Sequence, residues 1–203
     1  MTTTDSPALE RLSRLPVANI GDAMERLNVC HSAVRSTWEG ARLAGPALTV
    51  LTRPGDNLYV HRAIEAVRPG QVIVVAGGGD ETRALIGELI AGRAKAAGCA
   101  GFVLDGAVRD VAVIRALGMP VFARAVTPAG PYKNGPGALD VPVAIGGVVV
   151  SPGDYVLGDD DGVAVVTPAT ATDIAEKAEA KNAQEDAARA AIAEALGEPF
   201  PTG

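Results

Sequence analysis

The feature that most constrains the fold is an alternation of β-branched apolar runs with helical patterns in the middle of the chain. Four short runs, at residues 47–52, 71–76, 101–105 and 120–125, are bounded by turn residues or helical patterns and predict strands. Apolar residues at helical spacing predict helices between them, at 57–67, 81–97 and 108–117. Because strands that alternate with helices favour a parallel sheet, we expect an α/β fold with a central β-α-β-α-β unit.

The flanks of this unit predict different structure. Two short helices are expected before it, at residues 7–15 and 17–27. After it, short strands at 141–145, 148–150, 155–158 and 163–166 are separated by Gly-Gly, Pro-Gly-Asp and Asp-Asp-Asp-Gly turns, which are typical of an antiparallel meander. A helix from Ala169 to about Leu196 ends at Gly197. It has few large apolar residues, so it should lie on the surface or against another subunit.

Composition limits the classes of function. A chain of 203 residues with no evident boundary is expected to form a single domain, residues 1–203. Its 18 basic and 24 acidic residues give a net charge of −6, which argues against a nucleic-acid partner. Two cysteines without a Cys-x-x-Cys pair indicate reduced thiols. The residues from Met1 to Pro7 have no basic flank and no following apolar run, and no apolar stretch reaches the length of a membrane span. We therefore expect a cytoplasmic protein with no membrane partner.

Several familiar chemistries have no motif in this sequence. Only two histidines are present, so there is no His-x-x-x-His zinc motif, and no Gly-x-Ser-x-Gly nucleophile motif occurs. The triple glycine at 77–79 does not have the spacing of a nucleotide-binding loop. The remaining candidates are carboxylates.

The first candidate is the segment from Asp105 to Asp110, where a predicted strand leads through a glycine turn to Arg109 and Asp110 at a helix start. Ligands of open α/β sheets bind at such carboxyl ends of strands. Asp110 suits a hard cation such as Mg²⁺, and Arg109 suits a carboxylate or a developing enolate oxygen. The alternative is that Asp110 only complements the helix dipole and pairs with Arg109.

Two further segments are weaker candidates. In Gly87-Glu88-Leu89-Ile90, an anionic ligand could approach the backbone amides if the helix began at Gly87 instead of Glu81. Periodicity favours the start at Glu81, with Glu88 on the solvated face. The third candidate, Gly55-Asp56-Asn57 followed by His61, is equally compatible with a helix cap and a surface histidine.

Taken together, these motifs resemble a known family. Their order is Gly55-Asp56-Asn57, Pro69-Gly70, Gly77-Gly78-Gly79, Gly87-Glu88-Leu89-Ile90, Asp105-Gly106-Ala107-Val108-Arg109-Asp110 and Pro152-Gly153-Asp154. The chain from about residue 17 to 166 resembles the family of class II 4-hydroxy-4-methyl-2-oxoglutarate aldolases and regulators of ribonuclease activity A (RraA-like). The resemblance implies a swivelling β/β/α domain. It also implies homo-oligomers, trimers or hexamers, with active sites between subunits.

The resemblance also implies an activity. Family aldolases cleave 4-hydroxy-4-methyl-2-oxoglutarate or 4-carboxy-4-hydroxy-2-oxoadipate to pyruvate and a second oxo acid, with a divalent cation, and decarboxylate oxaloacetate. Carried over, Asp110 would bind Mg²⁺ or Mn²⁺, and Arg109 would contact the keto oxygen of a small 2-oxo dicarboxylic acid. Glu88 would hold metal-bound waters and act in proton transfer, while Leu89 and Ile90, beside Gly87, would bind the pyruvyl carboxylate. No lysine lies in these motifs, so no Schiff base is expected.

The C-terminal helix carries two further expectations from the resemblance. Spanning residues 169–197, it would pack on a neighbouring subunit and supply an acid to that subunit's site. Glu185 is the best match, with Glu179 and Asp186 as alternatives and a solvated charged face as another reading. Some members of the family are non-catalytic regulators that bind ribonuclease E. These tend to lack the long acidic helix, so its presence favours the lyase.

Overall fold

The computed structural model describes residues 6–201, and the first five residues of the N-terminal segment discussed above lie outside this range. The helices are α1 (Pro7–Leu12), α2 (Val17–Ala23), α3 (Leu58–Ala66), α4 (Glu88–Ala96), α5 (Val111–Ala116) and α6 (Ala171–Leu196). The strands are β1 (Arg35–Ser36), β2 (Leu43–Thr52), β3 (Val72–Ile86), β4 (Gly101–Val108), β5 (Val121–Val126), β6 (Gly137–Leu139), β7 (Val143–Ile145), β8 (Val148–Val150), β9 (Tyr155–Asp159) and β10 (Gly162–Val166).

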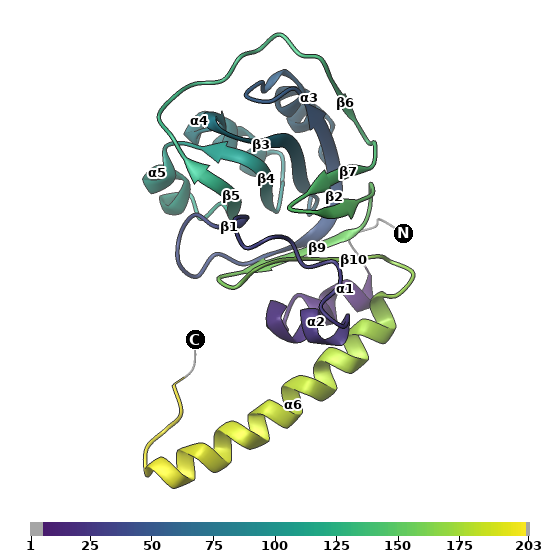
Figure 1. The fold of residues 1–203 in the computed structure, drawn as a ribbon, viewed down its shortest axis with the longest axis vertical. Coiled ribbons are helices and arrows are strands. Elements are labelled where there is room, and N and C mark those ends of the chain that lie inside the picture. Colours follow the sequence, from purple (N-terminus) through teal and green to yellow (C-terminus); the bar gives the residue numbers. More distant parts are fainter. Residues whose placement is uncertain (1–5, 202–203) are drawn as a thin grey trace.

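The predicted central unit is confirmed. Strands β2, β3, β4 and β5 lie side by side in parallel, connected by α3, α4 and α5 (Figure 1). Antiparallel strands extend this sheet at both ends, in the order β1-β5-β4-β3-β2-β9-β10, and β6 pairs with the end of β2. The chain is thus a mixed α/β fold, as predicted.

The meander prediction is wrong in its connectivity. Strands β7 and β8 form a separate two-stranded sheet, whereas β9 and β10 pair with each other and join the main sheet beside β2. The turns were recognisable, but the two hairpins bury their apolar residues in different places. Val143, Ile145, Val148 and Val150 pack over one face of the sheet, and Tyr155, Leu157, Ala164 and Val166 pack against the terminal helices.

The largest correction concerns the predicted helix at 81–97. Residues 81–86 continue β3, and the helix begins at Glu88. The pairing of β3 with β4 is irregular after Val75 but continues to the end of both strands, with Ala84 opposite Ala107 and Ile86 opposite Val108. Pairing with β4 buries Leu85 and Ile86 in the core, so tertiary contacts override the helical periodicity. Smaller differences are that α1 ends at Leu12, α2 ends at Ala23 and α5 begins at Val111.

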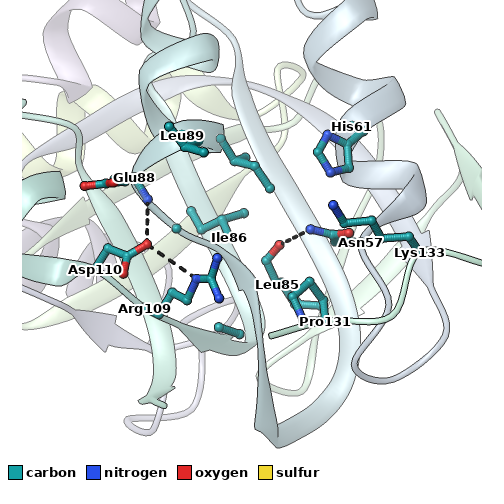
Figure 2. A pocket seen from close by; sticks show the side chains of 13 residues that line it. Asn57, His61, Leu85, Ile86, Glu88, Leu89, Arg109, Asp110, Pro131 and Lys133 are labelled. Carbon is teal, nitrogen blue, oxygen red and sulfur yellow. Dashed lines mark hydrogen bonds and ion pairs between the residues drawn. The ribbon is translucent and has the colours of Figure 1, made fainter. Parts of the chain in front are cut away.

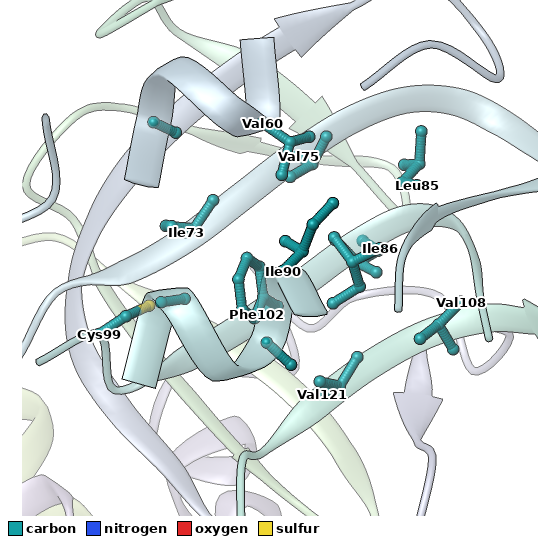
Figure 3. Close-up of a cluster of buried hydrophobic side chains, with 14 of the residues drawn as sticks. Val60, Ile73, Val75, Leu85, Ile86, Ile90, Cys99, Phe102, Val108 and Val121 are labelled. Carbon is teal, nitrogen blue, oxygen red and sulfur yellow. The ribbon is translucent and has the colours of Figure 1, made fainter. Parts of the chain in front are cut away.

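The core facing α3, α4 and α5 fixes the positions of the strand ends. Figure 3 shows Ile73 and Val75 of β3, Phe102 of β4 and Ile90 of α4 in one apolar cluster. Phe102 is fully buried, and Ile90 is 9% exposed although it lies in the first turn of its helix. This packing anchors the start of α4 against the carboxyl ends of the strands.

The C-terminal helix has one packed end. Ala171, Ile174, Ala175 and Ala178 are buried against α1 and α2, and Glu179 accepts two hydrogen bonds from Arg11, at 2.6 and 2.8 Å. Asn182 also accepts a hydrogen bond from Asn19 of α2, at 3.2 Å. Beyond these contacts α6 projects from the body of the protein (Figure 1). Within residues 6–201, no helix combines the length and hydropathy required to cross a membrane.

Candidate active site

A small cavity lies where three neighbouring parallel strands end. Asn57 follows β2, the segment Gly87–Ile90 follows β3, and Arg109 and Asp110 follow β4. The carboxyl edge of a parallel sheet is where α/β proteins bind ligands. The cavity has a volume of about 170 Å³ and is also lined by His61, Ala84, Leu85, Ile86, Pro131 and Lys133. This volume suits a small organic acid better than a nucleotide or other drug-sized ligand, whose pockets span roughly 300–1,000 Å³.

Gly87 allows the Asp110 carboxylate to approach the start of α4. A Cβ atom at Gly87 would lie 2.3 Å from Asp110 Oδ2 and 3.0 Å from both Cγ and Nε of Arg109. Its φ of −143° is ordinary extended backbone, so the requirement for glycine here is steric. Asp110 Oδ2 instead accepts a hydrogen bond from the Glu88 amide, at 3.1 Å (Figure 2).

Asp110 has an uncommon backbone conformation. Its φ of 57° and ψ of 33° lie in the left-handed region, at the residue that precedes α5. Aspartate tolerates this region better than most residues, and non-glycine residues found there cluster at functional sites. The conformation directs the carboxylate toward α4, where it binds the Glu88 amide, and no side-chain cap bond to α5 forms. Of the alternative interpretation, the pairing of Asp110 with Arg109 is present.

The start of α4 presents free backbone donors. The Ala91 amide is the first to bond within the helix, to the carbonyl of Gly87, and the Glu88 amide binds Asp110. In the described residues the amides of Leu89 and Ile90 bond to no protein group. Free amides and the positive end of the helix dipole form a site for a carboxylate.

Arg109 stands beside these donors. Its amide bonds to the Ile86 carbonyl at 3.1 Å, which fixes the end of β4 against the end of β3. The guanidinium Nε lies 3.4 Å from Asp110 Oδ2, and 43% of the side chain is exposed. In Figure 2 the carboxylate of Glu88 points away from this guanidinium. The Arg109 side chain therefore keeps donors available for a ligand oxygen.

The opposite wall contains two residues of the third sequence candidate, Asn57 and His61, and one residue that the sequence did not indicate, Lys133. Asn57, His61 and Lys133 lie together across the cavity from Arg109 (Figure 2). Asn57 and His61 are one helical turn apart at the start of α3, a spacing that could have predicted that they share a face. Lys133 comes from the loop after β5, and nothing in its local sequence indicates this position.

His61 is a donor in this arrangement. A guanidinium nitrogen of Arg93 lies 3.3 Å from His61 Nδ1, and because guanidinium groups only donate, Nδ1 accepts and the ring proton is on Nε2. Burial lowers the pKa of His61, and the positive charges of Lys133 and Arg93 lower it further against an opposing effect of Glu65. His61 is therefore neutral at pH 7.

Asp56 holds this wall in place. It is fully buried, and its carboxylate accepts hydrogen bonds from the amides of Leu58, Asn134 and Gly135, at 2.7–2.9 Å, and from Arg53 at 3.2 Å. Burial alone would raise the pKa of Asp56, but these donors outweigh it and the pKa is lowered. Asp56 thus binds the first amide of α3 and fastens the loop that carries Lys133.

The donors present fit a hard divalent cation. Within residues 6–201, no group of three or more His, Cys, Asp or Glu residues is arranged around one point, which excludes a zinc cage there. Mg²⁺ needs only one or two carboxylates and keeps several waters. Asp110 offers an exposed carboxylate whose Oδ1 bonds to no described residue, while its Oδ2 accepts from the Glu88 amide.

The structure brings most of the predicted site together but not all of it. Gly87, Glu88, Leu89, Ile90, Arg109 and Asp110 line one cavity. Glu185 lies outside it, on the projecting part of α6, where it pairs with Lys181 and Arg189 of the same helix. The alternative acid Glu179 is bound to Arg11, and Asp186 pairs with Arg189.

Comparison with known proteins agrees with the motifs. The family model described as RraA-like, Aldolase/RraA, matches residues 17–165. A protein of Halalkalibacterium halodurans named "Putative 4-hydroxy-4-methyl-2-oxoglutarate aldolase" is 38% identical over 194 residues, which is 96% of this chain and 92% of that protein.

Solved structures show the same fold. The RNA-processing inhibitor RraA from Thermus thermophilis has a TM-score of 0.68 at 35% identity, over 75% of this chain and 92% of its own. An unusual Streptomyces coelicolor member of the RNase ES inhibitor RraA family has a TM-score of 0.80 at 31% identity, over 91% of this chain and 98% of its own. With its family model, its relatives and its fold in agreement, the chain belongs to the Aldolase/RraA family.

Proposed function

We propose that the protein is a divalent-metal-dependent lyase that cleaves 4-hydroxy-4-methyl-2-oxoglutarate or 4-carboxy-4-hydroxy-2-oxoadipate to pyruvate and a second oxo acid. Oxaloacetate decarboxylation is expected as a second activity of the same site. One observation carries the proposal: free helix amides, an arginine and an exposed carboxylate meet at one small cavity. A relative named for this aldolase supports the choice of substrate.

Binding of the pyruvyl half follows from the geometry. The amides of Leu89 and Ile90 receive the carboxylate, and the Arg109 guanidinium receives the adjacent keto oxygen. Both reactions leave an enolate of pyruvate after a carbon–carbon bond breaks, so the same donors stabilise the negative charge as it develops on this oxygen.

Asp110, with Glu88 beside it, would hold Mg²⁺ or Mn²⁺. Such a cation supplies Lewis-acid polarisation of the keto group. The hydroxyl proton of the substrate has to reach a base, and Glu88 is the carboxylate at the cavity with no ion-pair partner among the described residues. Proton transfer to Glu88 through water is consistent with its outward orientation.

The second half of the substrate faces the opposite wall. A dicarboxylic acid bound at Arg109 extends toward His61 and Lys133, which offer a neutral Nε2–H donor and an ammonium group. These donors favour a substrate that carries a further carboxylate beyond its pyruvyl half. A monocarboxylate would leave the charge of Lys133 without a partner in the complex.

The site is proposed to be completed in a trimer or hexamer. The projecting part of α6 would cross to a neighbouring subunit and place Glu185 near that subunit's Asp110, which explains why so little of this helix is buried in one chain. The two buried, unpaired thiols, Cys30 and Cys99, fit a reducing compartment, and we place the protein in the cytoplasm.

A second candidate function is that of a non-catalytic protein that binds a ribonuclease. The likeness to RraA-type inhibitors favours it. On the sequence alone, the long C-terminal helix favours the lyase. It is a weak criterion, because the match to one structure of the RraA inhibitor family covers 91% of this chain. The functions differ in whether the cavity turns over an oxo acid.

The test is pyruvate release from 4-hydroxy-4-methyl-2-oxoglutarate and from oxaloacetate, with Mg²⁺, with EDTA and with Asp110→Asn. Metal-dependent release that Asp110→Asn abolishes supports the lyase, and the ratio of the two rates identifies the main activity. A folded protein that releases pyruvate from neither substrate favours the regulator.

For Glu185, truncation should remove only residues after Ala183, because removal after Val166 would expose the apolar cluster that Ile174 and Ala178 help to cover.

A further inference from the structure

Asn57 has a buried acceptor that the protein leaves unpaired. The residue is 2% exposed, and its Oδ1 has no hydrogen-bond partner among the residues that the structure describes. A buried amide oxygen without a donor is costly, and most such groups in proteins are satisfied. Since Asn57 lines the candidate active site, a bound ligand can supply the missing donor.

The orientation of the Asn57 amide is fixed by its other end. Nδ2 donates to the backbone carbonyl of Leu85 at 3.0 Å. A carbonyl only accepts, so exchanging Nδ2 and Oδ1 would bring two acceptors together. Oδ1 therefore remains the acceptor, on the side of the amide away from Leu85 and beside Lys133 (Figure 2).

The unpaired acceptor distinguishes between classes of oxo acid. Ionised carboxylates and keto groups only accept hydrogen bonds. Pyruvate and oxaloacetate in their keto forms therefore have no hydrogen-bond donor for Asn57 Oδ1. A 4-hydroxy-2-oxo acid carries a hydroxyl donor between its two carboxylate ends. A ligand that displaces water from Asn57 Oδ1 without donating a hydrogen bond to it binds more weakly than a ligand that does donate one.

We propose that Asn57 Oδ1 accepts a hydrogen bond from the hydroxyl group of the substrate, and thereby makes the site selective for hydroxylated over unhydroxylated acids. The inference rests on the proposed function, because it assigns a partner in the same cavity. An amide oxygen is not protonated at neutral pH, so Asn57 determines which acid binds, and the hydroxyl group has to turn from Asn57 toward the base before its single proton is transferred.

The test uses two ligands that cannot be cleaved because they have no 2-oxo group: 2,4-dihydroxyglutarate and 2-hydroxyglutarate. Their binding to the whole protein with Mg²⁺ is measured by calorimetry. We expect wild-type protein to bind the dihydroxy acid about tenfold more tightly, the value of one hydrogen bond to a buried acceptor. Asn57→Ala should remove this preference.

Asn57→Asp is the matched control for a structural role. It loses the Nδ2 bond to Leu85, as Asn57→Ala does, but it keeps an acceptor at the position of Oδ1. Its added negative charge weakens the binding of both dianionic acids equally, so the preference for the dihydroxy acid should persist. If Asn57 is merely structural, the two variants change both affinities in parallel, and the proposal is wrong.

The outcomes separate this inference from the proposed function. Equal binding of both acids to the wild-type protein overturns the role of Asn57 and leaves the lyase intact. Binding of neither acid, by a folded protein, overturns the inference together with the proposed substrate class.

Discussion

Replacement of Gly87 by alanine should separate activity from stability. The added Cβ would lie 2.3 Å from Asp110 Oδ2, well inside the closest approach that real Cβ atoms show. The backbone at Gly87 is extended and accepts alanine without strain. The side chains of Arg109 and Asp110, which are about two-fifths exposed, are therefore the groups that move.

The effect on stability should be small. Displacing the Asp110 carboxylate loses its hydrogen bond to the Glu88 amide, which is worth about 1.5–3 kcal/mol for a buried charged group and less at an exposed one. Replacing glycine by alanine at a compatible backbone position stabilises the folded protein by about 0.4–1 kcal/mol, because it restricts the unfolded chain. The free energy of unfolding should thus change by no more than about 1–2 kcal/mol.

The effect on activity should be large. A misplacement of about 1 Å in a positioned group costs roughly 100-fold in rate, and here Arg109 and Asp110 would move together. We expect kcat/KM for pyruvate release to fall at least about 100-fold. Coupled oxidation of NADH by lactate dehydrogenase measures the rate, and the fluorescence of the single tryptophan, Trp38, follows unfolding in urea.

Gly92→Ala is the matched control, because Gly92 lies in the same helix and a Cβ there meets nothing within 4 Å. It should stabilise the protein by about 0.5–1 kcal/mol and leave the rate unchanged. Wild-type turnover by Gly87→Ala would refute the reasoning. So would a loss of several kcal/mol, because Gly87 would then be needed for folding.

Further outcomes follow from single groups. Asp56→Asn should lower the free energy of unfolding by about 2–4 kcal/mol at pH 7, since three amides and Arg53 lose a charged acceptor. Because the pKa of Asp56 is lowered in the folded protein, this contribution is present above its ordinary value of 3.8 and fades as the pH falls below it, so urea unfolding at pH 7 and pH 3 should show the difference shrink. The lowered pKa of His61 acts in the same direction: the unfolded chain takes up the proton at a higher pH than the folded protein does, so stability should fall as the pH drops below 6.5, the ordinary pKa of histidine, and His61→Gln should reduce that slope in the same assay. Arg109→Lys should lose about 100-fold in kcat/KM while its melting temperature stays within a few degrees, because a lysine cannot reproduce the forked donor. Mg²⁺ should raise the melting temperature of the wild-type protein but not that of Asp110→Asn. An equal rise in both would show that Asp110 does not bind the metal.

The sequence by itself determined the central unit and the motifs. Alternating β-branched runs and helical patterns are local properties, so the parallel order of β2 to β5 could be predicted. The two motifs that supply Gly87 to Ile90 and Arg109 to Asp110 were also evident. Their meeting follows from topology, because the carboxyl ends of neighbouring parallel strands share one edge.

Only the tertiary structure decided where α4 begins. Residues 81–86 have helical spacing, but pairing with β4 buries Leu85 and Ile86 and holds them in β3. The same shift frees the amides of Leu89 and Ile90 for a ligand. The sequence indicated Asn57 and His61 but not Lys133, because Asp56 joins α3 to a loop about 78 residues further along the chain. Local sequence encodes propensity, whereas such contacts depend on groups that only folding brings within hydrogen-bond distance.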